Sequence, residues 1–152
     1  MMRMVRRLLL LCLGVAGGFI AAAAVLKRVL PSRGDASSDD VALVAILDGV
    51  EFSGESAAFR GGSMLAWFGG VNADLREAKL APDARLSVGA LLGGIALRVP
   101  PGWRVESSIR AFGGGVDVSG SDPEDPDAPL LRLDGIALLG GIAVARRPPA
   151  ET

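Results

Sequence analysis

An eight-residue phrase recurs five times along this chain of 152 residues. Each copy has Ala first, Gly fifth and Val or Ile sixth, and successive copies begin 21, 24, 21 and 26 residues apart. A repeat of this length is typical of solenoids, propellers and other arrays, in which neighbouring units share one core. The repeat therefore constrains the architecture more than any other feature. The copies span residues 45–52, 66–73, 90–97, 111–118 and 137–144.

Each copy combines a strand-like alternation with a glycine corner. Apolar residues alternate over positions 86–92, two glycines interrupt them, and the alternation resumes over positions 95–99. Such period-2 patterning indicates strands on both sides of the corner. We expect the fifth-position glycines to adopt positive φ without steric penalty and to let identical corners stack closely. These structural glycines are Gly49, Gly70, Gly94, Gly115 and Gly141.

The pattern predicts an all-β fold, a short right-handed parallel β-helix or solenoid of about five rungs, preceded by one N-terminal transmembrane α-helix. Rungs that follow one another at ~4.8 Å would build a column about 24 Å tall. A propeller blade needs about 40 residues and fits badly. An antiparallel β-sandwich stays open as the alternative, because Gly-Gly also suits two-residue hairpin turns.

The N-terminal segment is apolar over residues 8–26 and carries basic pairs at Arg6-Arg7 and Lys27-Arg28. Nineteen residues of helix span about 28 Å, close to the hydrocarbon thickness of a bilayer. We therefore predict a single-pass anchor in the cell membrane. A cleavable signal peptide is the alternative, since the small residues 21–24 suit a peptidase.

Two properties of this anchor stay open. Three basic residues stand on each side of the span, so the side of the membrane that holds the β domain is undecided. Gly14, Gly18 and Ala22 share one helix face, and this spacing would permit a homodimer through close helix approach. The sequence then divides into a transmembrane anchor over 1–30, a polar linker over 31–40, the β domain over 41–147 and a disordered tail over 148–152.

Composition excludes several functions. Residues 35–152 hold 10 basic and 17 acidic residues, so we expect no nucleic-acid partner, whose phosphates need basic side chains. Histidine is absent, which removes the commonest general base and a common metal ligand. The single cysteine, Cys12, lies in the apolar segment. We therefore predict no enzyme, no catalytic residue, no cofactor and no metal site.

Three groups of residues resemble ligand-binding or catalytic sites, but a structural role is favoured for each. The acidic loop 119–129 offers oxygen ligands for a hard cation, but prolines interrupt them and a solvated loop is favoured. The glycine pairs lack the Lys-Ser/Thr partner of a phosphate-binding loop. Lys79, the one lysine after the anchor, lies in no serine motif that would form a dyad. The loop's carboxylates are Asp122, Glu124, Asp125 and Asp127.

The second position of each copy is the strongest candidate for an interaction surface. If the first-position alanines point inward, alternation sends the second-position residues outward as one apolar ladder. Such a stripe marks contact with a partner, a second copy or lipid. Coverage by the linker, or a register shifted by one residue, is the alternative. Trp103 is either a second contact point or a corner plug. The stripe consists of Ile46, Trp67, Leu91, Phe112 and Leu138.

Three segments carry a resemblance to a known family: Ala66-Trp-Phe-Gly-Gly-Val-Asn-Ala-Asp-Leu-Arg-Glu-Ala, Ala90-Leu-Leu-Gly-Gly-Ile and Val99-Pro-Pro-Gly-Trp-Arg-Val. Over residues 41–145 the chain resembles the LiaF-like family, the C-terminal domains of cell-wall-active-antibiotics response proteins. The resemblance implies a β-rich solenoid on membrane helices and a part in envelope-stress signalling beside a membrane histidine kinase. It supplies no catalytic residue, and this chain has one predicted span where signalling relatives have several.

These observations together predict a non-catalytic, membrane-anchored interaction or regulatory module of the bacterial cell envelope, active in the response to cell-wall antibiotics. Its partners would be the lipid bilayer and a membrane signalling protein. The alternative is a self-associating structural scaffold, with solenoids stacked end to end. We expect Arg146-Arg147-Pro148-Pro149 to close the C-terminal end of the column, which disfavours filaments.

Overall fold

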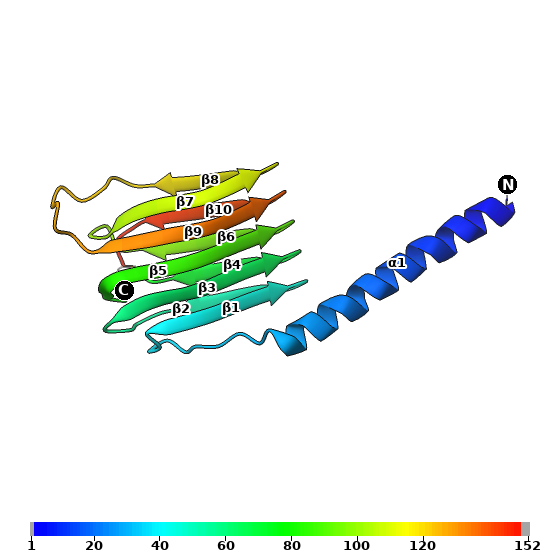
Figure 1. Ribbon diagram of the computed structural model, residues 1–152, viewed down its shortest axis with the longest axis horizontal. Coiled ribbons are helices and arrows are strands. Elements are labelled where there is room, and N and C mark those ends of the chain that lie inside the picture. Colours follow the sequence, from blue (N-terminus) through cyan, green and yellow to red (C-terminus); the bar gives the residue numbers. More distant parts are fainter. Residues whose placement is uncertain (1, 150–152) are drawn as a thin grey trace. The chain divides into compact units, whose positions relative to one another are not determined.

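The computed structural model describes residues 2–149 and contains an N-terminal helix followed by ten strands (Figure 1). The chain divides after Pro31 into two compact units, the helical segment and the β domain. The elements are α1 (Met2–Val29), β1 (Asp40–Ile46), β2 (Gly49–Ser53), β3 (Phe59–Trp67), β4 (Gly70–Asp74), β5 (Leu80–Leu91), β6 (Gly94–Val99), β7 (Arg104–Phe112), β8 (Gly115–Ser119), β9 (Leu130–Leu138) and β10 (Gly141–Arg146).

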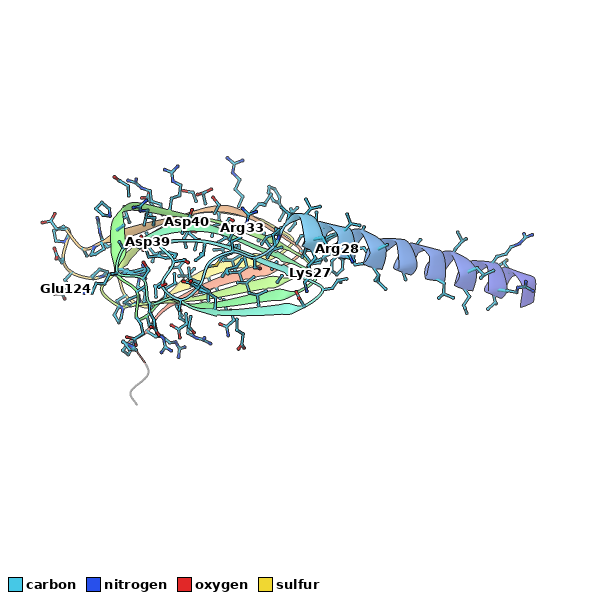
Figure 2. All side chains as sticks on the ribbon, turned by 90° about the horizontal axis from the view of Figure 1, so that it is seen from below. Lys27, Arg28, Arg33, Asp39, Asp40 and Glu124 are labelled. Carbon is cyan, nitrogen blue, oxygen red and sulfur yellow. The ribbon has the colours of Figure 1, made fainter. Side chains whose placement is uncertain are left out.

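Helix α1 is long and apolar enough, over Met4–Val29, to cross a membrane. Its length and composition confirm the predicted apolar N-terminal helix, and a signal sequence near the N-terminus would have the same properties. Lys27 and Arg28 lie in its last turn (Figure 2), where cations interact favourably with the helix dipole.

The β domain consists of two five-stranded sheets, and each copy of the repeat contributes one strand to each sheet. Sheet A has the order β1-β3-β5-β9-β7 and sheet B the order β2-β4-β6-β10-β8. All pairs between these strands are parallel, so the antiparallel sandwich is wrong. We call the strand pairs β1–β2, β3–β4, β5–β6, β7–β8 and β9–β10 repeat units 1 to 5.

The repeat units do not stack in chain order. Unit 5 lies between units 3 and 4, and unit 4 forms one end of the stack (Figure 1). The expectation that the C-terminal residues close an end of the column is therefore wrong. The connection from β8 back to β9 covers residues 120–129, whereas the other connections between units have four or five residues. The acidic loop supplies the extra length for this return.

Pairs of engineered cysteines would test this order. Ser87 lies in register with Asp134 of β9, and Asp134 lies in register with Ser108 of β7. In a Cys12→Ser background, we expect Ser87→Cys with Asp134→Cys to form a disulfide on oxidation, because neighbouring strands have suitable spacing. Ser87→Cys with Ser108→Cys spans two strand spacings, ~9.6 Å, and should stay reduced. A shift on a non-reducing gel reports the bond, and the reverse result would restore chain order.

Alternation along the strands builds one core between the sheets. The inward positions of the inner strands are buried aliphatic residues, among them Leu86, Leu97, Leu131 and Leu133. The first-position alanines Ala45, Ala66, Ala90 and Ala137 are also buried, whereas Ala111 of the end unit is exposed. Trp103 is only 4% exposed, so it plugs a corner and is not a surface contact point.

The predicted linker is partly ordered along one edge of sheet A. The backbone N–H of Arg33 donates to the Ala42 carbonyl at 2.6 Å, and the Ala42 N–H donates to the Arg33 carbonyl at 2.8 Å. The Ser32 hydroxyl accepts a hydrogen bond from the Val44 N–H at 2.9 Å. Residues 32–33 thus cover the outer edge of β1. Residues 150–152 of the predicted tail lie outside the described residues.

Candidate functional site

The corners between the two sheets have a left-handed backbone conformation that is uncommon for residues other than glycine. In every copy the third-position residue has positive φ. Four of the five are bulky apolar residues, for which this left-handed conformation costs roughly 1–2 kcal/mol. The fifth, Gly113, adopts it without that penalty. The values are φ 58° at Leu47, 50° at Phe68, 51° at Leu92, 50° at Leu139 and 66° at Gly113.

The left-handed turn allows the hydrogen-bond ladder to continue through the corner. The N–H of each of the four bulky third-position residues donates to the second-position carbonyl of the next unit in the stack, for example Phe68 to Leu91 at 3.0 Å and Leu92 to Leu138 at 2.9 Å. The N–H of Gly94 donates to the Gly69 carbonyl at 3.0 Å. Corner stacking therefore satisfies backbone groups that a looser turn would leave to solvent.

The fourth-position glycines, and not the fifth, make the close approach. A Cβ added at Gly69, Gly93, Gly140 or Gly114 would lie 1.8–2.4 Å from a carbonyl oxygen of the adjacent corner. The predicted role of the fifth-position glycines is wrong in this respect. None of them has positive φ, and an added Cβ would meet nothing closer than 3.7 Å. They are stacked in the order Gly49, Gly70, Gly94, Gly141 and Gly115.

The bulky third-position side chains form an exposed apolar surface, which we call the corner ridge. It consists of residues from units 1, 2, 3 and 5, whose corners are adjacent in the stack. An exposed run of large apolar residues on one edge is typical of a contact surface. The ridge residues and their exposed fractions are Leu47 44%, Phe68 41%, Leu92 42% and Leu139 63%.

The second-position stripe predicted from the sequence lies next to this ridge. Its members are in register in the order Ile46, Trp67, Leu91, Leu138, Phe112, so the last two exchange places relative to the chain. Ile46 is buried, the next three are half-buried, and Phe112 is 57% exposed. The stripe thus becomes more exposed toward unit 4.

Sequence reasoning missed the third position. The alternation rule assigns inward and outward faces only within a strand, and these residues lie in the turn. The available signal was the Leu or Phe before the glycine or aspartate of four copies, where turns usually carry polar residues. Trp67 and Phe68 are also in edge-to-face contact, with ring centroids 6.1 Å apart.

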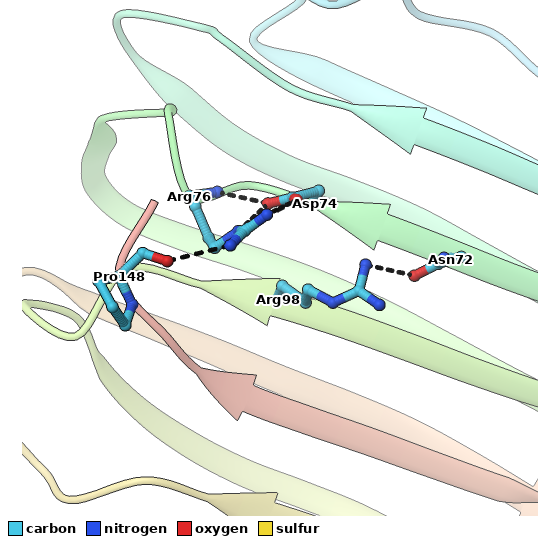
Figure 3. Close-up of polar contacts among 5 residues, drawn as sticks. All are labelled: Asn72, Asp74, Arg76, Arg98 and Pro148. Carbon is cyan, nitrogen blue, oxygen red and sulfur yellow. Dashed lines mark hydrogen bonds and ion pairs between the residues drawn. The ribbon is translucent and has the colours of Figure 1, made fainter. Parts of the chain in front are cut away.

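Polar contacts on the outer side of sheet B tie down the end of the chain (Figure 3). Arg76 donates to the Asp74 carboxylate at 2.6 Å and to the Pro148 carbonyl at 3.0 Å. Because Arg76 donates hydrogen bonds to it, the pKa of Asp74 lies below its ordinary value. Arg98 donates to the Asn72 side-chain oxygen at 3.1 Å. These groups are mutually satisfied, and the arrangement is that of a structural tie.

Hydrogen bonds to β10 and within the loop hold the acidic loop in place. The Asp122 carboxylate accepts a hydrogen bond from Arg146, and that of Asp125 accepts one from the Asp127 N–H at 2.9 Å. Glu124 lies on the same loop (Figure 2). Across the described residues, no three acidic or cysteine side chains are grouped so as to hold a metal ion.

Comparisons with models of protein families, with curated proteins and with solved structures give no match to this chain.

Proposed function

We propose that this protein is a non-catalytic interaction and regulatory module of the bacterial cell envelope. In this proposal α1 anchors the chain in the membrane, and the two parallel sheets form a short β-solenoid that presents the corner ridge to a protein partner. The length and apolar character of α1 support the anchor. The shared core of five stacked units supports the solenoid.

The observation that carries the proposal is the combination of strain and exposure in the corner ridge. Glycine would adopt the left-handed conformation at lower cost, as Gly113 does in unit 4. Yet Leu47, Phe68, Leu92 and Leu139 occupy it with more than 40% of each residue exposed. Because so much of each residue is exposed, the stability gained by burying these side chains is small. A backbone outlier of this kind motivates a functional hypothesis, and a contact surface explains it.

The resemblance to the LiaF-like family gives the proposal its biological setting. It supports a role in sensing or damping envelope stress, with a membrane signalling protein as the partner. An apolar ridge fits such a role, because the buried core of an interface is poor in charged residues and more apolar than the rest of the surface.

A glycine substitution in the ridge would separate folding from function. We expect Leu139→Gly to leave the free energy of unfolding unchanged or to raise it by up to about 1 kcal/mol, because relief of the left-handed strain offsets the loss of a mostly exposed side chain. Denaturant unfolding of the full chain in detergent measures this. Both tryptophans, Trp67 and Trp103, lie in the β domain, so their fluorescence reports that domain alone.

The functional test uses Leu92→Gly with Leu139→Gly in the host cell. We expect the protein to accumulate normally and the response to a cell-wall antibiotic to fall to that of a deletion strain. Glu51→Gly on the outer side of sheet B is the control, because this exposed residue lies outside the ridge. A double variant that responds like the wild type would contradict the proposal.

A further inference from the structure

The two ends of the stack differ in how their sheet A edges are covered. Residues 32–33 pair with β1, the edge strand of unit 1. Strand β7, the opposite edge, has a neighbour on one side only, β9 (Figure 1). Within the described chain, no segment is paired with the outer edge of β7. This edge therefore presents a row of backbone donors and acceptors for another strand.

The inward-facing residues are also better buried on β1 than on β7. On β1, Val41, Leu43 and Ala45 are at most 3% exposed. On β7, Ile109 is half-buried and Ala111 is exposed, although both face the core side. On the sheet A side, the core is therefore closed at unit 1 and incompletely covered at unit 4. A stack that ends in this way gains by burying its last unit against something else.

We propose that the uncovered edge of β7 pairs with the β7 edge of a second copy of this chain, antiparallel across a two-fold axis at Ser108. The proposal goes beyond the ridge and does not depend on it. In such a pair, a residue that precedes Ser108 in one copy lies opposite the residue that follows Ser108 by the same number of positions in the other copy. Glu106 of each copy then lies opposite Arg110 of the other, which gives two ion pairs across the interface.

Charge selects this register over its neighbours. Side chains alternate between the two faces of a strand, so opposite residues share a face only if the two-fold axis passes through a residue. The alternatives closest to Ser108 are therefore axes at Ser107 and at Ile109. An axis at Ser107 would place Arg104 opposite Arg110, which repel. An axis at Ile109 would place Glu106 opposite Phe112 and form no ion pair. In the register at Ser108, Arg104 lies opposite Phe112, whose exposed ring suits a guanidinium.

The isologous contact through β7 joins two copies and leaves no free β7 edge for a third. An isologous contact uses the same surface of both copies and consumes it. Further growth would need the opposite end, where the chain's own residues 32–33 occupy the edge of sheet A. Head-to-head pairing through β7 thus yields a closed pair at this end of the stack.

Charge reversal tests the proposal in the full chain in detergent. We expect Glu106→Arg and Arg110→Glu, each alone, to weaken dimerisation at least about tenfold, because each turns two attractive pairs into two repulsive ones. The double variant Glu106→Arg/Arg110→Glu restores opposite charges and should return the dissociation constant to within about threefold of wild type. Sedimentation at several concentrations measures each constant.

Tryptophan fluorescence checks that every variant is folded. The ion pair of Glu106 with Arg132, 3.6 Å apart and exposed, is lost in the single variant, but exposed pairs contribute little to stability. A folded wild-type chain that stays monomeric would overturn the proposal. Folded single variants that dimerise normally, or a folded double variant no better than the singles, would also overturn it.

A cysteine on the proposed axis provides a second test. In the Cys12→Ser background, Ser108→Cys should form a disulfide-linked dimer on mild oxidation, because opposite residues in an antiparallel pair are within disulfide reach. Ser87→Cys is the matched control, since Ser87 is exposed on the same face but on the central strand β5. Equal cross-linking at the two positions would contradict pairing through β7.

Discussion

Gly93→Ala is expected to destabilise the β domain by about 3 kcal/mol or more, which is a large part of the stability of a typical domain. The new Cβ would lie 2.4 Å from the Gly69 carbonyl oxygen of the adjacent corner, and backbone cannot rotate away as a side chain can. Relief would require the corner to move. Such a movement would disturb the hydrogen bond from the Gly94 N–H to the Gly69 carbonyl.

The neighbouring glycine is the matched control for this prediction. A Cβ at Gly94 would meet nothing closer than the Gly141 carbonyl oxygen at 3.7 Å, which is ordinary contact. We expect Gly94→Ala to change the free energy of unfolding by less than about 1 kcal/mol. Denaturant unfolding of the two variants, followed by tryptophan fluorescence, measures the difference. Equal losses would show that the corner tolerates no side chain at either position, which would contradict the close approach of the fourth-position glycines alone.

Arg146→Ala is expected to lower the free energy of unfolding by about 2 kcal/mol, because it removes a buried charged donor and leaves the carbonyl of the buried Trp103 without this partner. The Arg146 side chain is 5% exposed. It donates to the Trp103 carbonyl at 3.2 Å, to the Gly120 carbonyl at 2.6 Å and to the Asp122 carboxylate. It thereby joins β10 to the corner before β7 and to the returning loop.

Arg147→Ala is the control, because Arg147 is exposed and its backbone N–H makes the contact to the Val99 carbonyl at 2.9 Å. We expect a loss below about 0.5 kcal/mol. Arg146→Lys should fall between the two, since lysine keeps the charge but not the planar fork that reaches three acceptors. Thermal unfolding followed by fluorescence would rank the three variants. An Arg146→Ala variant as stable as Arg147→Ala would mean that the hydrogen bonds of Arg146 to the returning loop do not stabilise the domain.

The corner glycines illustrate how far sequence reasoning extends. The Gly-Gly pairs correctly located the corners, because glycine marks a bend whatever surrounds it. The assignment of roles within each pair was wrong, because two neighbouring glycines look alike in sequence. Gly93 faces the carbonyl of the next corner and Gly94 faces open space, and this difference arises only when the units stack.

For the candidate surface, too, the sequence predicted one part and the structure decided the rest. Periodicity placed Trp67, Leu91 and Leu138 in register on one face, but it could not show that Ile46 is buried while Phe112 is exposed. The more exposed residues, such as Leu139, lie in a left-handed turn that no alternation rule describes. The clue was the unusual chemistry of that position.

The sequence by itself determined the local elements: an apolar N-terminal helix, short alternating strands and tight glycine corners. Each of these depends on residues that are close together in the chain, so the local pattern is sufficient. Only the tertiary structure decided the order of the units and the identity of the uncovered edge at β7. The five copies have nearly the same local pattern and can stack on one another in several orders, so the choice rests on contacts between distant segments, on the long return through residues 120–129 and on the Arg146 tie.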